Sequence, residues 1–478
     1  MSYKDLHAYL AALDQAGQLK RISVPVDSRL EIAEITDRVS KRIGPALLFT
    51  NVKCSDFPVL TNAFGSFRRM ELALSVKSLD QPAARIRRLL HSENYLTLSD
   101  KVKALPRLAG LAAALPVTLS HGSCMEQEEI PDLSRLPALL CWPEDGGRYL
   151  TLPVVCTADP DTGAHNYGVY RMQVFGRRTA GLHWHLHKDG RSIFEKYRKR
   201  GGKMPVSVVI GCDPAVTYAA TAPLPPGLDE MLLAGFLRGR PVSLVKSHLS
   251  FIKVPAASEF LLEGYVDTDE LREEGPFGDH TGYYSEKAPY PVFHLKRMTR
   301  RAHPVYQATV VGRPPMEDCY MAKATERIFL PFLQLVCPEI QDIDLPLEGV
   351  FHNCAVVSIA KRYPGQAFKV MHALWGMGQM MYQKMIVIVD ADVDPHNRSE
   401  VLWRVCNNID PGRDLLVTPG PLDALDHASP VRHFGNRLGI DATRKLPEEG
   451  HPRPWPRNLR RPEEILSQVT ERWKEYGF

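Results

Sequence analysis

Several features that mark common protein classes are missing from this chain of 478 residues. Its 9 cysteines are scattered and never form a C-x-x-C pair, which excludes a disulfide framework or a thiolate zinc site and favours a reducing compartment. No apolar stretch reaches the roughly 18 residues that a membrane-spanning helix needs. Lys and Arg (59) exceed Asp and Glu (55) by only +4 and form no long basic block, so charge gives no argument for nucleic-acid binding.

Familiar catalytic motifs are also missing. The sequence contains no G-x-x-x-x-G-K-[ST], no G-x-G-x-x-G after a strand, no G-x-S-x-G and no H-E-x-x-H, which disfavours nucleotide hydrolysis, ordinary dinucleotide binding and triad hydrolysis. The N-terminus becomes polar within four residues and lacks the apolar core of a signal peptide. With 44% hydrophobic and 24% charged residues, we expect a cytoplasmic globular protein of two or three domains.

The pattern of helix-like and strand-like segments changes three times along the chain. Residues 1–120 mix helical and strand patterns, 121–315 consist of short β-rich runs, 316–445 alternate helix and strand, and 446–478 form a Pro-rich arm and a helix. The β-rich part predicts an all-β barrel or sandwich, and the alternating part predicts a largely parallel sheet covered by helices. The fold class is therefore α+β with several domains. Specific expectations include a strand over Tyr167–Phe175 and a helix over Gln366–Tyr382.

The last 17 residues predict an amphipathic helix. Pro462 stands where proline is tolerated, at the start of a helix, and Glu463 and Glu464 follow where the helix dipole favours acids. One face of this helix carries Ile465, Leu466, Val469, Trp473 and Tyr476. The helix either packs back on its own domain or reaches a partner subunit.

A first polar cluster spans residues 166–173. An Arg in a β-rich run, here Arg171, can present its planar fork to a carboxylate or phosphate. The alternative is an Arg that reaches the solvated rim of the sheet.

A second cluster is His183-Trp184-His185-Leu186-His187. On a strand, alternate positions would put all three imidazoles on one side, which is metal-ligand geometry if they are buried. The alternative is a solvated strand face with one or two structural histidines. The pattern itself does not say which imidazole would bind a metal.

The third cluster covers residues 273–284, with the sequence EEGPFGDHTGYY. Gly275, Pro276 and Gly278 exclude a helix, so Glu274 and Asp279 are predicted on a rigid loop. Two acids beside a His are suited to proton transfer, because burial and mutual repulsion separate their pKa values. An acidic turn in water is the alternative.

Taken in order, several segments resemble the UbiD family of decarboxylases. The resemblance covers residues 3–447 and is carried by N-Y-G-x-Y-R-M-Q, W-x-x-H, the run DEMLLAGFLRG from Asp229, E-G-P-F-G-D-H-T-G-Y-Y, G-R-P-P and KMIVIVDADVD. It implies a central split β-barrel that binds prenylated FMN, flanked by an α/β N-terminal region and an α/β C-terminal domain. It also implies a flavin prenyltransferase as the supplier of the cofactor and a homo-oligomer that uses the C-terminal helix.

The resemblance also assigns roles to individual residues. Arg171, Glu274 and Asp279 match the catalytic set, and Asn166, His187 and Glu230 match the ligands of a divalent metal, Mn²⁺ or Mg²⁺, at the cofactor phosphate; K⁺ is a further candidate ion. Cofactor contacts are expected from these metal ligands and from Tyr170, Arg171, Met172, Gln173 and, less securely aligned, Lys384. Asp279 stands where some members have Glu, which favours the branch that acts on hydroxyaryl quinone precursors.

The physical chemistry is compatible with this assignment. Loss of CO₂ from an aromatic acid leaves charge on an aryl carbon that no side chain can delocalise, so an electron-accepting cofactor is required. We therefore expect decarboxylation of a hydroxylated aromatic acid in ubiquinone or menaquinone synthesis. A catabolic aryl decarboxylase, a flavin- or metal-binding protein without this activity, and a metal hydrolase built on His183, His185 and His187 remain alternatives.

Overall fold

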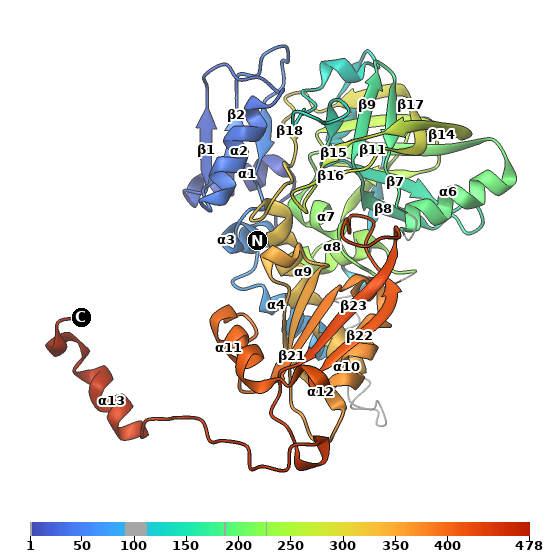
Figure 1. The fold of residues 1–478 in the computed structure, drawn as a ribbon. Helices are drawn as coiled ribbons and strands as arrows, with labels where there is room; N and C mark the ends of the chain where they lie inside the picture. Colours follow the sequence, from blue (N-terminus) through green and yellow to red (C-terminus); the bar gives the residue numbers. More distant parts are fainter. Residues whose placement is uncertain (1, 91–111, 186–187, 226) are drawn as a thin grey trace, which may run out of the picture.

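The chain folds into three β-sheet units with a projecting tail (Figure 1). The computed structural model describes residues 2–90, 112–185, 188–225 and 227–478. His187, expected as a metal ligand, lies outside the described residues. Within these ranges, no helix is both long and apolar enough to cross a membrane.

A four-stranded sheet organises the N-terminal part, in the order β1-β2-β3-β18. Its elements are α1 (Leu6–Gln15), β1 (Leu19–Ile22), α2 (Glu31–Lys41), β2 (Ala46–Phe49), β3 (Val59–Thr61), α3 (Phe67–Ala73), α4 (Asp80–Leu90) and β18 (Tyr306–Gln307). Asp5 caps α1 by accepting a hydrogen bond from the Ala8 N–H at 2.9 Å. Since β18 is contributed by residues far along the chain, this sheet joins the N-terminal part to the end of the central part.

The central sheet is a curled, antiparallel half-barrel of nine strands. Its order is β6-β9-β10-β17-β14-β11-β7-β8, with β5 paired to β17. The strands are β5 (Gln127–Glu129), β6 (Tyr149–Leu150), β7 (Val154–Ala158), β8 (His165–Val169), β9 (Met172–Gly176), β10 (Thr179–Leu182), β11 (Lys203–Ile210), β14 (Phe260–Glu274) and β17 (Ala288–Arg300). Two register shifts between β14 and β17 bend this long hairpin, as β-bulges do.

Smaller elements surround the half-barrel. Three helices pack against it: α6 (Asp189–Arg200), α7 (Pro214–Ala219) and α8 (Glu230–Arg238). A three-stranded sheet is formed by β4 (Val117–Leu119), β12 (Ser243–Lys246) and β13 (Lys253–Pro255), and a two-stranded sheet by β15 (Phe277–Gly278) and β16 (Tyr284–Ser285). The predicted multidomain α+β fold with an all-β centre is confirmed.

The C-terminal sheet has the order β19-β20-β21-β23-β22, with three parallel strands in the middle and antiparallel strands at both edges. Its elements are α9 (Glu317–Val336), β19 (Ile340–Asp344), β20 (Cys354–Ile359), α10 (Gln366–Trp375), β21 (Met385–Asp390), α11 (Arg398–Asn408), α12 (Pro411–Asp414), β22 (Leu415–Pro421) and β23 (Phe434–Asp441).

The single helix predicted over Gln366–Tyr382 is wrong in its second half. Helix α10 ends at Trp375, and residues Gly378–Tyr382 form a separate 3₁₀ turn. Gly378 has a φ of +44°, a conformation that an α-helix does not contain. The Trp375 indole N–H then donates to the Gln383 carbonyl at 2.7 Å, which fixes the chain after the break.

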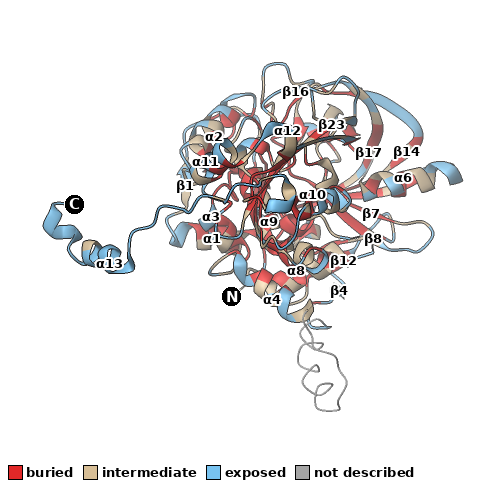
Figure 2. Ribbon diagram, turned by 60° about the horizontal axis from the view of Figure 1, so that its bottom comes forward, coloured by how far each residue is buried: buried red, intermediate tan, exposed pale blue. Residues whose placement is uncertain are grey.

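The tail helix, α13 (Glu463–Glu471), lies at the end of an extended arm and away from the sheets of its own chain (Figures 1 and 2). Its apolar side chains Ile465 and Leu466 retain 44% and 47% of their accessible surface. In this structure the helix therefore does not pack back on its own domain. The prediction that the helix continues through Trp473 and Tyr476 is wrong, because α13 ends at Glu471 and residues Trp473–Tyr476 form a separate 3₁₀ turn.

Candidate active site

Arg171 lies where the chain passes from one end of the curled sheet to the other. The strand predicted over Tyr167–Phe175 is wrong, because β8 ends at Val169 and β9 begins at Met172. Strand β8 pairs with β7, whereas β9 pairs with β10 and β6, so the two halves belong to opposite ends of the sheet. The pairing of β8 and β9 with different strands therefore accompanies this break, and Arg171 lies in the connection between them.

The structure brings Arg171 together with both predicted acids. The Arg171 Nε donates to Glu274 Oε1 at 3.0 Å, and Nη1 donates to Asp279 Oδ2 at 2.5 Å. Side-chain exposure is 9% for Arg171, 0% for Glu274 and 6% for Asp279, so the pairs are screened little by water. The guanidinium also donates to Ser285 Oγ at 3.0 Å and lies 4.5 Å from the ring centroid of Phe277.

The loop between the two acids is turned tightly by its glycines. Glu274 is the last residue of β14, and Gly275 has a φ of +99°, which favours glycine. At Gly278, a Cβ atom would lie 2.1 Å from Trp142 Cδ1, so no other residue fits there without displacing the indole. This backbone presents Glu274 and Asp279 to the same guanidinium.

Both acids are ionised in this arrangement. Burial raises the pKa of Glu274, but the hydrogen bond from His183 and the charge of Arg171 outweigh it, and the pKa falls to about 2. The pKa of Asp279 is well below its usual range, because the charges of His280 and Arg171 overcome the effect of burial. Burial lowers the pKa of His280, but neighbouring Asp279 raises it to about 9. The raised Glu274 pKa that a resting general acid needs is thus not present here.

His183, Trp184 and His185 do not lie on a strand. Strand β10 ends at Leu182, before the first histidine. His183 Nδ1 lies 2.8 Å from Glu274 Oε2, and His183 Nε2 lies 3.1 Å from His185 Nε2. The first histidine is therefore a partner of the catalytic candidate Glu274, a contact that the H-x-H-x-H pattern did not indicate.

Two of the three predicted metal ligands lie close together beside the half-barrel. Asn166 belongs to β8 and Glu230 opens α8, and the N–H of Tyr167, next to Asn166, donates to Glu230 Oε2 at 3.2 Å. Burial raises the pKa of Glu230 to about 8, and the buried Asn166 Nδ2 has no partner among the described residues. The Glu230 carboxylate, whose charge burial leaves under-compensated, and the side-chain oxygen of Asn166 fit an oxygen-preferring divalent cation, whereas the unpartnered Asn166 Nδ2, a donor, fits an acceptor such as a phosphate oxygen.

The remaining predicted cofactor residues are placed as follows. Tyr170 and Met172 are buried, and a Cβ at Gly168 would lie 2.3 Å from the Tyr170 ring. Gln173 donates to the Gly146 carbonyl at 2.6 Å and accepts from the Gly275 N–H at 2.8 Å, so it holds the loop that carries the acids.

Lys384 is engaged elsewhere. Its Nζ donates to Asp426 Oδ2 at 2.5 Å, within the C-terminal sheet unit. Its expected contact with the cofactor stays a prediction.

Contacts that the sequence did not suggest join the acid loop to the C-terminal sheet unit. His280 Nε2 lies 3.0 Å from His352 Nε2, the rings of Tyr283 and His427 lie 4.2 Å apart, and Glu286 forms an ion pair with Arg432. No local signal announces such pairs, since each joins residues from two different units.

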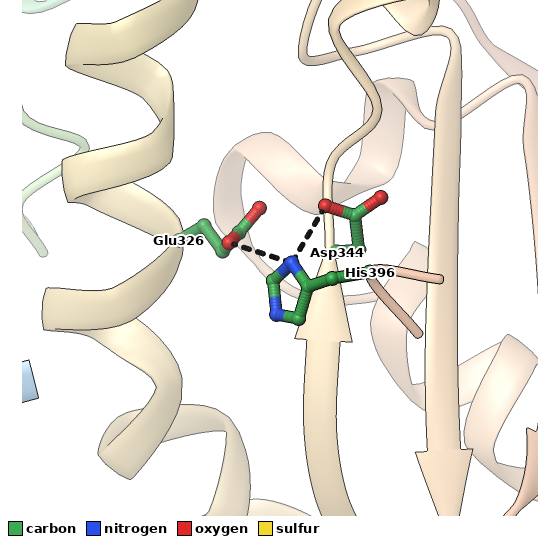
Figure 3. Close-up of side chains that lie close together, drawn as sticks. All are labelled: Glu326, Asp344 and His396. Atoms are coloured by element: carbon green, nitrogen blue, oxygen red, sulfur yellow. Dashed lines mark ion pairs between the residues drawn. The ribbon is translucent and has the colours of Figure 1, made fainter. Parts of the chain in front are cut away.

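A second acidic cluster, Glu326, Asp344 and His396, resembles a metal site in its ligand types (Figure 3). However, Lys323 Nζ already donates to Glu326 at 2.8 Å and pairs with Asp344 as well. His396 Nδ1 lies 3.0 Å from Asp344, and hydrogen bonds to Asp342 and then Asp344 raise the pKa of His396 to about 9. Two cationic side chains thus neutralise these acids, and the cluster is an ion-pair network.

Family models cover most of the chain. Residues 10–90, 116–314 and 319–442 match the N-terminal, Rift-related and C-terminal domains of 3-octaprenyl-4-hydroxybenzoate carboxy-lyase, the UbiD family. An uncharacterised protein of Archaeoglobus fulgidus is 47% identical over 99% of both chains.

Solved structures show the same fold. Vanillic acid decarboxylase of Sedimentibacter hydroxybenzoicus, in its closed form, is 28% identical, with a TM-score of 0.86 over 100% of this chain and 99% of that one. An evolved dimeric form of the UbiD-class enzyme HmfF from Pelotomaculum thermopropionicum, in complex with prenylated FMN, is 26% identical, with a TM-score of 0.80 over 97% of this chain and 98% of that one.

Proposed function

The chain belongs to the UbiD family of carboxy-lyases, and from this premise we propose that it decarboxylates a hydroxylated aromatic acid with prenylated FMN, in ubiquinone or menaquinone biosynthesis. The observation that carries the proposal is the buried Arg171 held between Glu274 and Asp279. This arrangement offers a carboxylate-binding fork and two acids at one point, which is what a decarboxylase must supply to substrate and product.

The cofactor and its metal fit residues of this chain. When bound, the modified flavin accepts the electron pair that the departing CO₂ leaves behind. Asn166 and Glu230, with His187 by family resemblance, would hold Mn²⁺ or Mg²⁺ at the cofactor phosphate. The Glu230 carboxylate, whose pKa burial raises to about 8, supports this assignment, and the unpartnered Asn166 Nδ2 can donate to a phosphate oxygen.

Arg171 and Glu274 then divide the work on the substrate. The substrate carboxylate competes with Glu274 for the guanidinium of Arg171. As Glu274 loses part of that positive charge, its pKa rises and the carboxylate takes up a proton from solvent. Once CO₂ has left, Glu274 hands its proton to the carbon atom that carried the carboxylate. Asp279, which stays paired with His280, keeps Arg171 in place.

The tail helix supports assembly into a homo-oligomer. Its half-exposed Ile465 and Leu466, and Trp473 in the turn that follows, offer apolar surface that a second copy of the chain can cover. A flavin prenyltransferase is the expected supplier of the cofactor.

A catabolic phenolic-acid decarboxylase is the second candidate function. The similarity to vanillic acid decarboxylase over the full length of both chains favours it. Both candidates share the same catalytic residues, so the substrate distinguishes them.

The decisive experiment uses protein that is co-produced with a flavin prenyltransferase. Mass spectrometry of the released cofactor is expected to give prenylated FMN, and a panel of polyprenyl hydroxybenzoate, naphthoate and simple phenolic acids identifies the substrate by CO₂ release. Binding of the cofactor without CO₂ release from any member would contradict the proposed function. Selective turnover of simple phenolic acids would favour the catabolic candidate.

A further inference from the structure

Glu274 has a second partner besides Arg171. His183 Nδ1 lies 2.8 Å from Glu274 Oε2, whereas the nearest Arg171 nitrogen lies 3.0 Å from Oε1. Arg171 Nη2 also lies 3.4 Å from Oε2, so Oε2 has both the imidazole and the guanidinium as partners, whereas Oε1 has the guanidinium alone. Glu274 is 0% exposed and His183 5% exposed, so water does not compete with either contact.

The surroundings of His183 fix which of its nitrogens carries the proton. Burial, followed by the charge of Arg171, lowers the pKa of His183, so the ring is neutral near pH 7. Because an ionised carboxylate only accepts hydrogen bonds, Nδ1 must be the N–H that faces Glu274. Nε2 is then an acceptor, and both the Tyr290 hydroxyl at 3.4 Å and His185 Nε2 at 3.1 Å lie within reach to donate to it.

The orientation of the ring is also fixed. The His183 and Tyr290 ring centroids lie 4.1 Å apart, with 32° between the planes. Stacking against Tyr290 leaves the imidazole little freedom to turn away from Glu274.

We propose that His183 is a positioning residue that acts through Glu274: its Nδ1–H holds Oε2 at 2.8 Å, so that the proton used in the reaction is carried by Oε1, the oxygen that His183 does not hold. This inference rests on the proposed function for its catalytic meaning. The contact keeps Glu274 ionised until Arg171 turns to the substrate, and it aims the opposite oxygen at the point where the substrate carboxylate was bound.

Three substitutions distinguish the effect of the Nδ1–H hydrogen bond from the effect of the volume of the ring. Asn at this position offers an N–H at nearly the same place as Nδ1, Gln offers one further out, at the place of Nε2, and Leu offers none. His183→Asn is therefore expected to preserve the effect, whereas His183→Gln and His183→Leu remove it.

A matched control lies elsewhere in the half-barrel. His248 Nδ1 contacts the fully buried Glu263 at 3.1 Å, which is the same kind of pair outside the candidate site. His248→Leu removes a comparable contact without touching Glu274.

The first measurement is the titration of Glu274 in the full chain without cofactor, by ¹³C NMR of labelled glutamate carboxyls, assigned with Glu274→Gln. Loss of a hydrogen bond to a buried carboxylate is expected to raise its pKa by about one to two units in His183→Leu and His183→Gln. His183→Asn and His248→Leu are expected to leave the Glu274 titration unchanged. An unchanged titration in His183→Leu, or a His183→Asn titration that matches it, would overturn the proposal.

The second measurement is turnover of the cofactor-loaded enzyme. His183→Leu and His183→Gln are expected to lose about 10- to 100-fold in kcat with KM and bound cofactor little changed, while His183→Asn stays within about threefold of wild type. Equal losses in all three variants would contradict positioning by the N–H. If wild type itself releases no CO₂, the proposed function fails, but the titration still decides whether His183 controls Glu274.

Discussion

Removal of the Arg171 guanidinium tests the electrostatics of the site without any cofactor. In the wild-type chain the pKa of Glu274 is lowered from 4.5 to about 2. At 1.36 kcal/mol per unit, this shift corresponds to about 3 kcal/mol of stability near neutral pH. His183 shares in that shift, but in Arg171→Gln the carboxylates of Glu274 and Asp279 stay buried and lose their shared cation, which in buried pairs costs about 3–5 kcal/mol, so we expect a loss of about 3 kcal/mol.

The loss translates into a thermal shift. At about 2.1 cal/mol/K of unfolding entropy per residue, 3 kcal/mol lowers the midpoint by about 3 °C if the whole chain unfolds together, and by about 7 °C if a unit of about 200 residues unfolds alone. Calorimetry of the protein without cofactor measures this shift. Arg432→Gln, which breaks an exposed ion pair with Glu286 on the same loop, is the matched control and is expected to change the midpoint little.

The difference in unfolding midpoint between wild type and Arg171→Gln is expected to depend on pH. In wild type, the lowered pKa of Glu274 contributes stability that is present above about pH 4.5 and is lost as the pH falls toward 2. In Arg171→Gln, burial is no longer opposed by the guanidinium, so the pKa of Glu274 rises and its folded form takes up a proton closer to neutrality. The midpoint difference between the two proteins is expected to be widest at pH 8 and to narrow toward pH 5.

The double variant Arg171→Gln/Glu274→Gln completes the test. Because Gln removes one of the two buried charges that lack a cation, the unfolding midpoint of the double variant at pH 8 is expected to lie between those of Arg171→Gln and wild type. A midpoint in Arg171→Gln that equals wild type at pH 8, or a difference that does not change with pH, would refute the reasoning.

Three further predictions address other parts of the molecule. Glu230→Gln is expected to lose bound Mn²⁺ and, with it, most of the cofactor, as measured by elemental analysis and flavin absorbance; full metal content would remove Glu230 from the ligand set. His396, whose pKa is raised to about 9 first by its hydrogen bond to Asp342, contributes stability that is present below pH 6.5 and is lost as the pH rises through 9. Between pH 7 and pH 9.5 the midpoint of wild type is therefore expected to fall further than that of His396→Ala, and parallel curves would contradict this. Leu466→Glu is expected to dissociate the oligomer in light scattering, whereas Glu464→Lys on the same helix is not; an unchanged mass for both would show that the tail is not the interface.

Much of the candidate site could be predicted because its functional residues lie in short sequence motifs. Gly275, Pro276 and Gly278 exclude a helix by their backbone preferences alone, so the loop that carries Glu274 and Asp279 follows from local sequence. The contact of both acids with Arg171 was expected from family resemblance alone. Local sequence could not predict it, because 103 residues separate Arg171 from Glu274.

Two of the errors have their origin in non-local pairing. Nothing in residues 167–175 marks the break at Tyr170, because it arises when β8 and β9 join opposite ends of the sheet. His183 meets a partner 91 residues away, and the alternation of histidines suggested a metal instead. Only Gly376 and Gly378 gave a local hint, which helical periodicity outweighed, that the helix ends at Trp375.

The central claim is that Glu274 delivers the proton that replaces CO₂. The most direct measurement is turnover in D₂O by enzyme loaded with prenylated FMN and Mn²⁺, with the product analysed by mass spectrometry. We predict one deuterium at the carbon that lost its carboxyl group in wild type, and no product from Glu274→Gln although its cofactor content is the same. Wild-type turnover by Glu274→Gln would contradict the account.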